Sequence, residues 1–85
     1  MLEKSFINKH ASGLHARPAA LLVQKANSFP CEISLTRGDK RVSARSLLSI
    51  ISLGIGANES VTVIAAGEKE AEAIQAIGEL LEAGE

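Results

Sequence analysis

The apolar residues of this chain recur at two different spacings, and the order of these spacings limits the folds that it can adopt. Apolar residues alternate with polar ones over 31–37 and again over 60–66, a two-residue period that predicts strands. They recur every three to four positions over 16–27 and 68–83, which predicts amphipathic helices. Because each element has one apolar face to bury, we expect an α+β fold in which helices cover one face of a small sheet.

Three shorter segments complete the expected order. Residues 2–9 and 40–43 are predicted strands, and the second of these forms a hairpin with the strand before it. Residues 47–53 are a predicted short helix that Gly54 ends. The order is therefore strand, helix, strand, strand, helix, strand, helix (βαββαβα), in a single domain over residues 1–85.

The composition is that of a globular chain without a membrane segment. Hydrophobic residues make up 46% of the 85 residues, which excludes an intrinsically disordered protein. No apolar run approaches the roughly 20 residues that a membrane span needs, and the first residues lack the layout of a signal peptide. The single cysteine excludes an internal disulfide. These features predict a cytoplasmic protein that is not inserted into a membrane.

The net charge of −1 hides an uneven distribution. Residues 1–45 carry eight Lys and Arg and three acidic residues, a balance of +5, whereas residues 46–85 have a balance of −6. This asymmetry indicates a basic face that favours anionic groups or acidic partners, although it is also compatible with ordinary solubility. The basic half has no stripe of Lys and Arg interleaved with aromatics, so we expect no nucleic-acid partner.

A histidine lies where the first predicted helix begins, within the stretch 13–19, GLHARPA. The start of a helix presents backbone N–H groups without intrahelical acceptors and the positive end of the helix dipole, and both stabilise an anion. The neutral imidazole of His15 is a nitrogen nucleophile at physiological pH, and Arg17 remains charged and can donate to phosphate oxygens. His15 is thus a candidate phosphoryl acceptor, with Arg17 stabilising the phosphate.

Neighbouring residues are expected to support this helix start. Gly13 allows the loop to bend sharply, and Pro18 fits the first turn of a helix because no backbone donor is lost there. The supporting set is Ser12, Gly13, Ala16 and Pro18. The alternative interpretation is structural: His15 caps the helix, and Arg17 is a solvated side chain.

A second helix start lies at Ser46, which has two interpretations. The structural one is an N-cap, typically worth about 1 kcal/mol. The functional one is a phosphorylation site, because a phosphate is stabilised at a helix start and changes the charge of the surface around it. Ile50 and Leu53 of the following helix are expected in the core. The apolar residues left over form a candidate partner-binding patch of Leu47, Leu48 and Ile51.

The remaining candidates are expected to be structural. His10 lies in a polar turn and is predicted to be a surface residue. Cys31 falls on the inward face of a predicted strand, where a buried and inert thiol is expected. No Cys or carboxylate cluster accompanies His10, so no metal site is predicted, and the chain has no nucleotide-binding loop or hydrolytic constellation. We therefore expect no cofactor.

Two motifs resemble those of one known family. Residues 13–19 resemble the active-centre signature of HPr, the histidine-containing phosphocarrier family of the bacterial phosphoenolpyruvate:sugar phosphotransferase system. Residues 46–54, SLLSIISLG, resemble the regulatory serine segment of the same family. The chain length and the βαββαβα order match as well. The resemblance implies an open-faced β-sandwich, in which a four-stranded antiparallel sheet is covered on one face by three helices.

The resemblance also implies a phosphoryl carrier rather than an enzyme. His15 would be phosphorylated on Nδ1 by phosphorylated enzyme I and would pass the group to enzyme IIA domains of sugar permeases, with Arg17 as the partner of the phosphate. In the Gram-positive branch, the serine that matches Ser46 is phosphorylated by an HPr kinase/phosphorylase, and this form assists a catabolite-control repressor. Leu48 and Ile51 stand where methionines are common in that branch, so apolar contact is retained.

Two other function classes stay open at this point. In the first, the protein is a regulatory HPr-like binding module that acts in catabolite repression through phospho-Ser46, with His15 as a relic. In the second, it is a small nucleic-acid binder, whose affinity would fall steeply with salt. A monomer is expected in each case, although short loops between exchangeable elements permit strand swapping.

Overall fold

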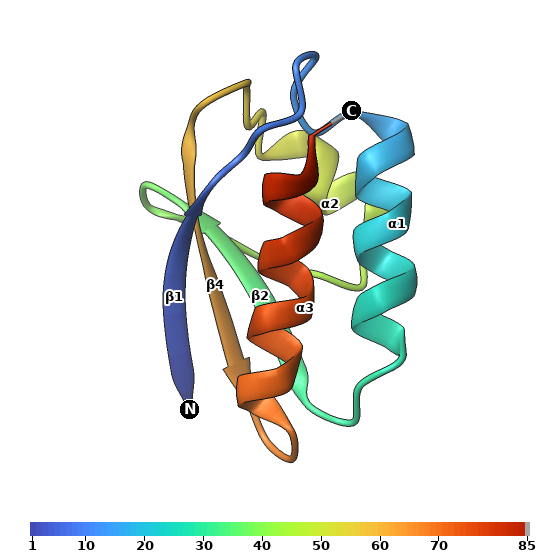
Figure 1. Ribbon diagram of the computed structural model, residues 1–85, viewed down its shortest axis with the longest axis vertical. Helices are drawn as coiled ribbons and strands as arrows, with labels where there is room; N and C mark the ends of the chain where they lie inside the picture. Colours follow the sequence, from blue (N-terminus) through green and yellow to red (C-terminus); the bar gives the residue numbers. More distant parts are fainter. Residues whose placement is uncertain (85) are drawn as a thin grey trace.

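The computed structural model describes residues 1–84, and its elements follow the order expected from the sequence (Figure 1). In chain order they are β1 (Leu2–Ile7), α1 (Ala16–Asn27), β2 (Glu32–Arg37), β3 (Lys40–Ser43), α2 (Leu47–Ser52), β4 (Ser60–Ala66) and α3 (Glu70–Ala83). Every predicted strand and helix is present, with shifts of one or two residues at some ends. No helix within the described range is long and apolar enough to cross a membrane.

The four strands form one antiparallel sheet in the order β1-β4-β2-β3, and the three helices cover one of its faces (Figure 1). β4 and β2 lie in the middle of the sheet, and β1 and β3 form its edges. α1 packs against both α2 and α3, so the helices form a continuous second layer. The predicted α+β open-faced sandwich is therefore confirmed.

Alternate residues of the central strands point toward the helices and form the core. Val61, Val63 and Ala65 of β4 are buried, as their alternation predicts. The register places Leu35 of β2 opposite Val63, so both side chains lie on the same face of the sheet. The helices add their own apolar faces to this layer, with Leu22, Ile50, Ile74, Ile77 and Leu81 all buried.

Phe6 and Gly78 fit together between β1 and α3. Phe6 is the more buried of the two phenylalanines, and it points at α3 from the edge strand. A Cβ atom at Gly78 would overlap the Phe6 ring. Glycine lowers the stability of a helix interior, so its presence in α3 is explained by this close approach.

Two of the predicted element ends are wrong for identifiable reasons. β1 ends at Ile7 rather than at Lys9, because the chain then leaves β4 and the Lys9 N–H donates to a carbonyl of α3. α3 begins at Glu70 rather than at Glu68, because Lys69 has a left-handed backbone (φ +62°) that cannot continue a helix.

Two predictions about buried side chains have different outcomes. Cys31 is buried as expected, although it lies just before β2 rather than inside it. In α1, the apolar spacing predicts a buried stripe that includes Ala16, Ala19, Leu22 and Ala26; the last three are buried, and Ala16 is exposed. His15 and Arg17, the neighbours of Ala16 in sequence, are exposed as well, so this end of α1 is at the surface.

Candidate functional site

His15 occupies the N-cap position of α1, where the sequence places the start of the helix. Its backbone is extended (φ −93°, ψ −163°), and its carbonyl accepts the first helical hydrogen bond, from the Ala19 N–H at 3.0 Å. Its imidazole is exposed and makes no capping hydrogen bond to the helix. This geometry therefore does not support the structural alternative, in which the His15 side chain caps the helix. The ring lies at the positive end of α1 instead.

A tight turn delivers the chain to His15. The Gly13 N–H donates to the His10 carbonyl at 2.9 Å, which closes the turn, and Gly13 has a left-handed backbone (φ +81°). The Leu14 N–H then donates to the Ile55 carbonyl at 2.9 Å. A Cβ atom at Gly13 would lie 2.8 Å from that same carbonyl oxygen. The predicted bend at Gly13 is confirmed, and the close approach of backbone to backbone adds a second reason for glycine.

The other predicted residues of this helix start fall on two sides of it. Arg17 and Ala16 are exposed in the first turn of α1, and Ser12 is exposed in the turn before it, so all three lie at the surface close to His15 in sequence. Pro18 is the third helical residue and is buried, which agrees with its predicted place in the first turn. The exposed group is thus polar and basic, and the buried proline anchors it to the fold.

Asn8 supports the site from beneath, and the sequence reasoning missed it. Its side chain is fully buried, and Nδ2 donates to the Gly56 carbonyl at 3.0 Å. Its backbone N–H donates to Glu59 O (2.9 Å), and its carbonyl accepts from the Asn58 N–H (2.7 Å). The loop before β4 is thereby joined to the chain that leads to His15. The signal in the sequence was a small amide at the inward position directly after a strand.

Glu59 holds the same loop through charge-assisted hydrogen bonds. Oε1 accepts from the Gly56 N–H at 2.6 Å, and Oε2 accepts from Arg37 Nη2 at 3.0 Å. Arg37 Nη1 also donates to the carbonyl of Leu53, at the end of α2. The hydrogen bond from Gly56, followed by that from Arg37, lowers the pKa of the Glu59 carboxyl. The end of α2, the loop and β2 are therefore linked beside the His15 turn.

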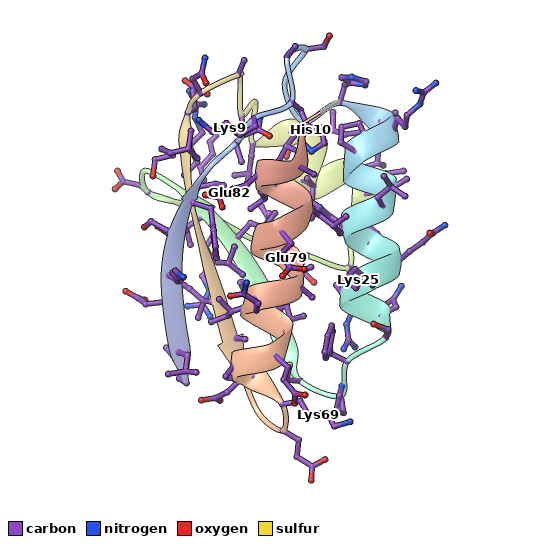
Figure 2. The ribbon with its side chains drawn as sticks, viewed as in Figure 1. Lys9, His10, Lys25, Lys69, Glu79 and Glu82 are labelled. Carbon is purple, nitrogen blue, oxygen red and sulfur yellow. The ribbon has the colours of Figure 1, made fainter. Side chains whose placement is uncertain are left out.

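The prediction that His10 is a surface residue is wrong. Only 6% of it is exposed, and its Nε2 lies 2.8 Å from the carbonyl oxygen of Leu80 in the last turn of α3. Figure 2 shows His10 at the C-terminal end of that helix, beside Lys9. The turn is polar in sequence, but the fold places it over the end of α3. That placement depends on residues about seventy positions away, and a local pattern cannot report it.

Ser46 is the N-cap of α2, as the structural interpretation predicts. Its Oγ accepts from the Ser49 N–H at 3.3 Å and donates to Ser49 Oγ at 2.9 Å. Ile50 and Leu53 are buried, which confirms their place in the core. The predicted patch is at the surface, with exposed fractions of 79% for Leu48 and 37% each for Leu47 and Ile51.

A family model agrees with this arrangement over nearly the whole chain. Residues 2–83 match the family described as "PTS HPr component phosphorylation site". The chain belongs to the HPr family. HPr proteins are phosphocarriers, and this chain has an exposed histidine at the start of α1 and a serine that caps α2.

Known proteins that resemble this HPr-family chain include some named HPr and some named Crh. The HPr-like protein Crh of Halalkalibacterium halodurans is 44% identical over 77 residues, which cover 91% of this chain and 92% of Crh. The solved structure of HPr-C-His from Thermoanaerobacter tengcongensis has a TM-score of 0.92 at 42% identity and covers 98% of this chain and 93% of that one. The phosphocarrier protein HPr of Bacillus anthracis has a TM-score of 0.91 at 36% identity, with 95% and 96% covered.

No potential metal-binding group was found in the part of the chain that the structure describes: residues 1–84 contain no cluster of three or more His, Cys, Asp or Glu in suitable positions. The candidate site consists instead of one exposed imidazole, one exposed guanidinium and the backbone of a helix start. Such a site can hold an anion at the surface, where a second protein can reach it.

Proposed function

We propose that His15 accepts a phosphoryl group on Nδ1 from one protein and passes it to another. The observation that carries this proposal is the exposed His15 ring at the N-cap of α1, which is not used as a cap. The N–H groups of the first helical turn therefore keep their capacity to interact with an anion attached to the ring. Arg17 in the same turn supplies a permanent positive charge for the phosphate oxygens.

The transfer needs His15 as a neutral nucleophile. The lone pair of Nδ1 attacks phosphorus while the proton of the ring remains on Nε2. The bond from phosphorus to the donor breaks, and its electron pair leaves with the donor. In the second step the acceptor attacks phosphorus, and the electron pair of the N–P bond returns to Nδ1. Moderate stabilisation by the helix and Arg17 keeps both directions accessible, as a carrier requires.

The partners that fit this role are those of the phosphotransferase system. Phosphorylated enzyme I is the proposed donor, and enzyme IIA domains of sugar permeases are the proposed acceptors. Leu47, Leu48 and Ile51 are the proposed docking patch, because they are apolar, exposed and carried on the helix beside α1. The protein would act as a cytoplasmic monomer over residues 1–85. A dimer of HPr from Thermoanaerobacter tengcongensis has been solved, so the oligomeric state is a point to measure.

The test is labelling with enzyme I and phosphoenolpyruvate. We expect an acid-labile phosphate on the wild-type protein and none on His15→Ala. Arg17→Ala should be labelled more slowly, whereas Lys25→Ala, which removes a cation from the last turn of α1, should behave as wild type. An acid-labile phosphate on His15→Ala would overturn the assignment.

A second function is favoured by Ser46 and by the match to a Crh protein. We propose that an HPr kinase/phosphorylase modifies Ser46, and that this form binds a catabolite-control repressor. Ser46 Oγ is half-buried as a cap, and its phosphate would remain at the start of α2. ATP with the kinase should give an acid-stable label that Ser46→Ala lacks. Such a label together with none from phosphoenolpyruvate would favour a purely regulatory module.

A further inference from the structure

His10 connects the turn before His15 to a distant helix. Its Nε2 lies 2.8 Å from Leu80 O, and a carbonyl oxygen can only accept, so Nε2 must carry the proton. In the neutral ring, Nδ1 is then the atom with the lone pair. Nδ1 is buried and has no hydrogen-bond partner among residues 1–84. The ring is therefore held through a single atom, Nε2, in a defined tautomer.

The partner of Nε2 is a helix end that needs a donor. The last four carbonyls of a helix have no intrahelical N–H, and Leu80 directly precedes the first of these, Leu81, in the last turn of α3. The last turn of α3 contains no basic residue that could supply the charge or the donor. His10 supplies a donor from outside the helix, and the Lys9 N–H supplies another to Leu81 O at 2.9 Å.

The backbone of His10 begins the turn that ends at His15. Its carbonyl accepts from the Gly13 N–H at 2.9 Å, and its N–H donates to Asn8 Oδ1 at 3.3 Å. At the far end of the turn the Leu14 N–H is bound to the loop before β4. The turn is thus held at both ends. At its first residue, the side chain of His10 makes the long-range link to α3.

We propose that His10 is a positioning residue for phosphoryl transfer at His15. This inference rests on the proposed function, in which His15 takes the phosphoryl group. The Nε2–Leu80 link fixes the first residue of the turn against α3, so the N-cap geometry of His15 is set before a partner arrives. Reacting atoms tolerate little displacement, since an error of about 1 Å can cost on the order of 100-fold in rate.

Two amide substitutions distinguish the hydrogen bond to Leu80 O from the general effect of a polar side chain at position 10. His10→Gln places its amide nitrogen near the position of Nε2 and should keep the bond to Leu80 O. His10→Asn places the same group near the position of Nδ1 and should lose that bond. We expect His10→Asn to lower the maximal rate of transfer from phosphorylated enzyme I by about 10- to 100-fold. The affinity for enzyme I should change little, and His10→Gln should stay close to the wild-type rate.

A separate control is needed for the effect of reduced stability on the rate of transfer. Ile74→Val removes a buried methylene group from the other half of α3, away from the His10 turn, and should destabilise the protein without slowing transfer. Nitrogen-15 NMR of the wild-type protein should show His10 with its proton on Nε2. The ring signals of His15 should shift in His10→Asn and not in Ile74→Val.

The outcomes distinguish this inference from the proposed function. A wild-type protein that takes no phosphate on His15 overturns both. Labelling of the wild type with an unchanged rate in His10→Asn, or an equal loss in Ile74→Val, overturns the inference alone. If His10→Asn does not fold, the wild-type spectrum decides, because a His10 ring with no proton on Nε2 cannot donate to Leu80 O and excludes the link.

Discussion

At the scale of single residues, Gly13 carries the strictest requirement of the site. Its positive φ is costly for any residue with a Cβ atom, and the space that this atom would fill is taken by the Ile55 carbonyl oxygen. Gly38 also has a positive φ (+61°), but nothing lies within 4 Å of its would-be Cβ. A comparison of the two glycines therefore separates the cost of backbone strain from the cost of steric overlap.

This contrast gives the first prediction. Gly13→Ala should lower the free energy of unfolding by roughly 2–5 kcal/mol, because strain and overlap both apply. Gly38→Ala should lower it by about 1–2 kcal/mol, because only strain applies. Urea denaturation of both variants provides the measurement. Equal losses would contradict the close approach at Gly13.

Glu59 gives a prediction about pH. Its folded pKa is lowered, first by the Gly56 N–H and then by Arg37, so the folded state favours the ionised carboxylate. The resulting stability is fully present above the unfolded pKa of about 4.3 and is lost as pH falls through the lower folded value. The stability difference between wild type and Glu59→Gln should therefore shrink as pH falls below about 4.

The matched control for Glu59 is another glutamate in the same protein. Glu32 is exposed on β2 and makes none of these contacts, so Glu32→Gln should leave the pH dependence of unfolding close to that of the wild type. Denaturation series between acid and neutral pH compare the three proteins. An equal effect of both substitutions would show that the Glu59 contacts contribute nothing specific.

At the scale of elements, α2 is a helix of six residues that depends on its cap. Short helices are marginal, and Ser46 satisfies the N–H of Ser49. Ser46→Ala should lower the free energy of unfolding by about 1 kcal/mol, whereas Ser46→Asp should keep the cap and the stability. Ser52→Ala, at the exposed end of α2, should cost less. Urea denaturation of the unmodified variants tests this, and a neutral Ser46→Ala would contradict it.

α3 provides a prediction in which two effects oppose each other. Alanine is a better helix former than glycine by about 1 kcal/mol, but a Cβ atom at Gly78 overlaps the Phe6 ring. Overlap should prevail, and Gly78→Ala should destabilise the protein by about 1–3 kcal/mol. Phe6→Leu makes room for the methyl group. The double variant should therefore lose less stability than the sum of the losses in the two single variants. Additive losses in thermal or urea denaturation would contradict this contact.

At the scale of the whole molecule, the fold separates an exposed apolar patch, the proposed docking patch, from the core within one short helix. Leu48 is 79% exposed and Ile50 is fully buried, two positions apart. Leu48→Ser should leave the free energy of unfolding within about 0.5 kcal/mol of wild type and weaken the proposed docking of enzyme I. Ile50→Ala should cost about 2–5 kcal/mol. Equal effects of the two on stability would contradict the assignment of faces.

The arrangement around His15 is also a property of the whole molecule. The turn before it contacts the loop before β4 through Leu14 and Asn8, and it contacts α3 through His10. These segments come from the start, the middle and the end of the chain (Figure 1). The exposed histidine therefore follows a short turn that two distant parts of the fold, the loop before β4 and α3, hold in place.

The sequence by itself determined the order of elements, the helix starts at His15 and Ser46, and the burial of the β4 face. These features depend on residues within a few positions of one another: a period of two or about four, a cap and a glycine that bends the chain. Only the tertiary structure decided that His10 is buried, that Asn8 joins two loops and that Gly78 makes room for a ring. Each of these depends on a contact between residues dozens of positions apart, and the spacing of side chains along the chain holds no record of such contacts.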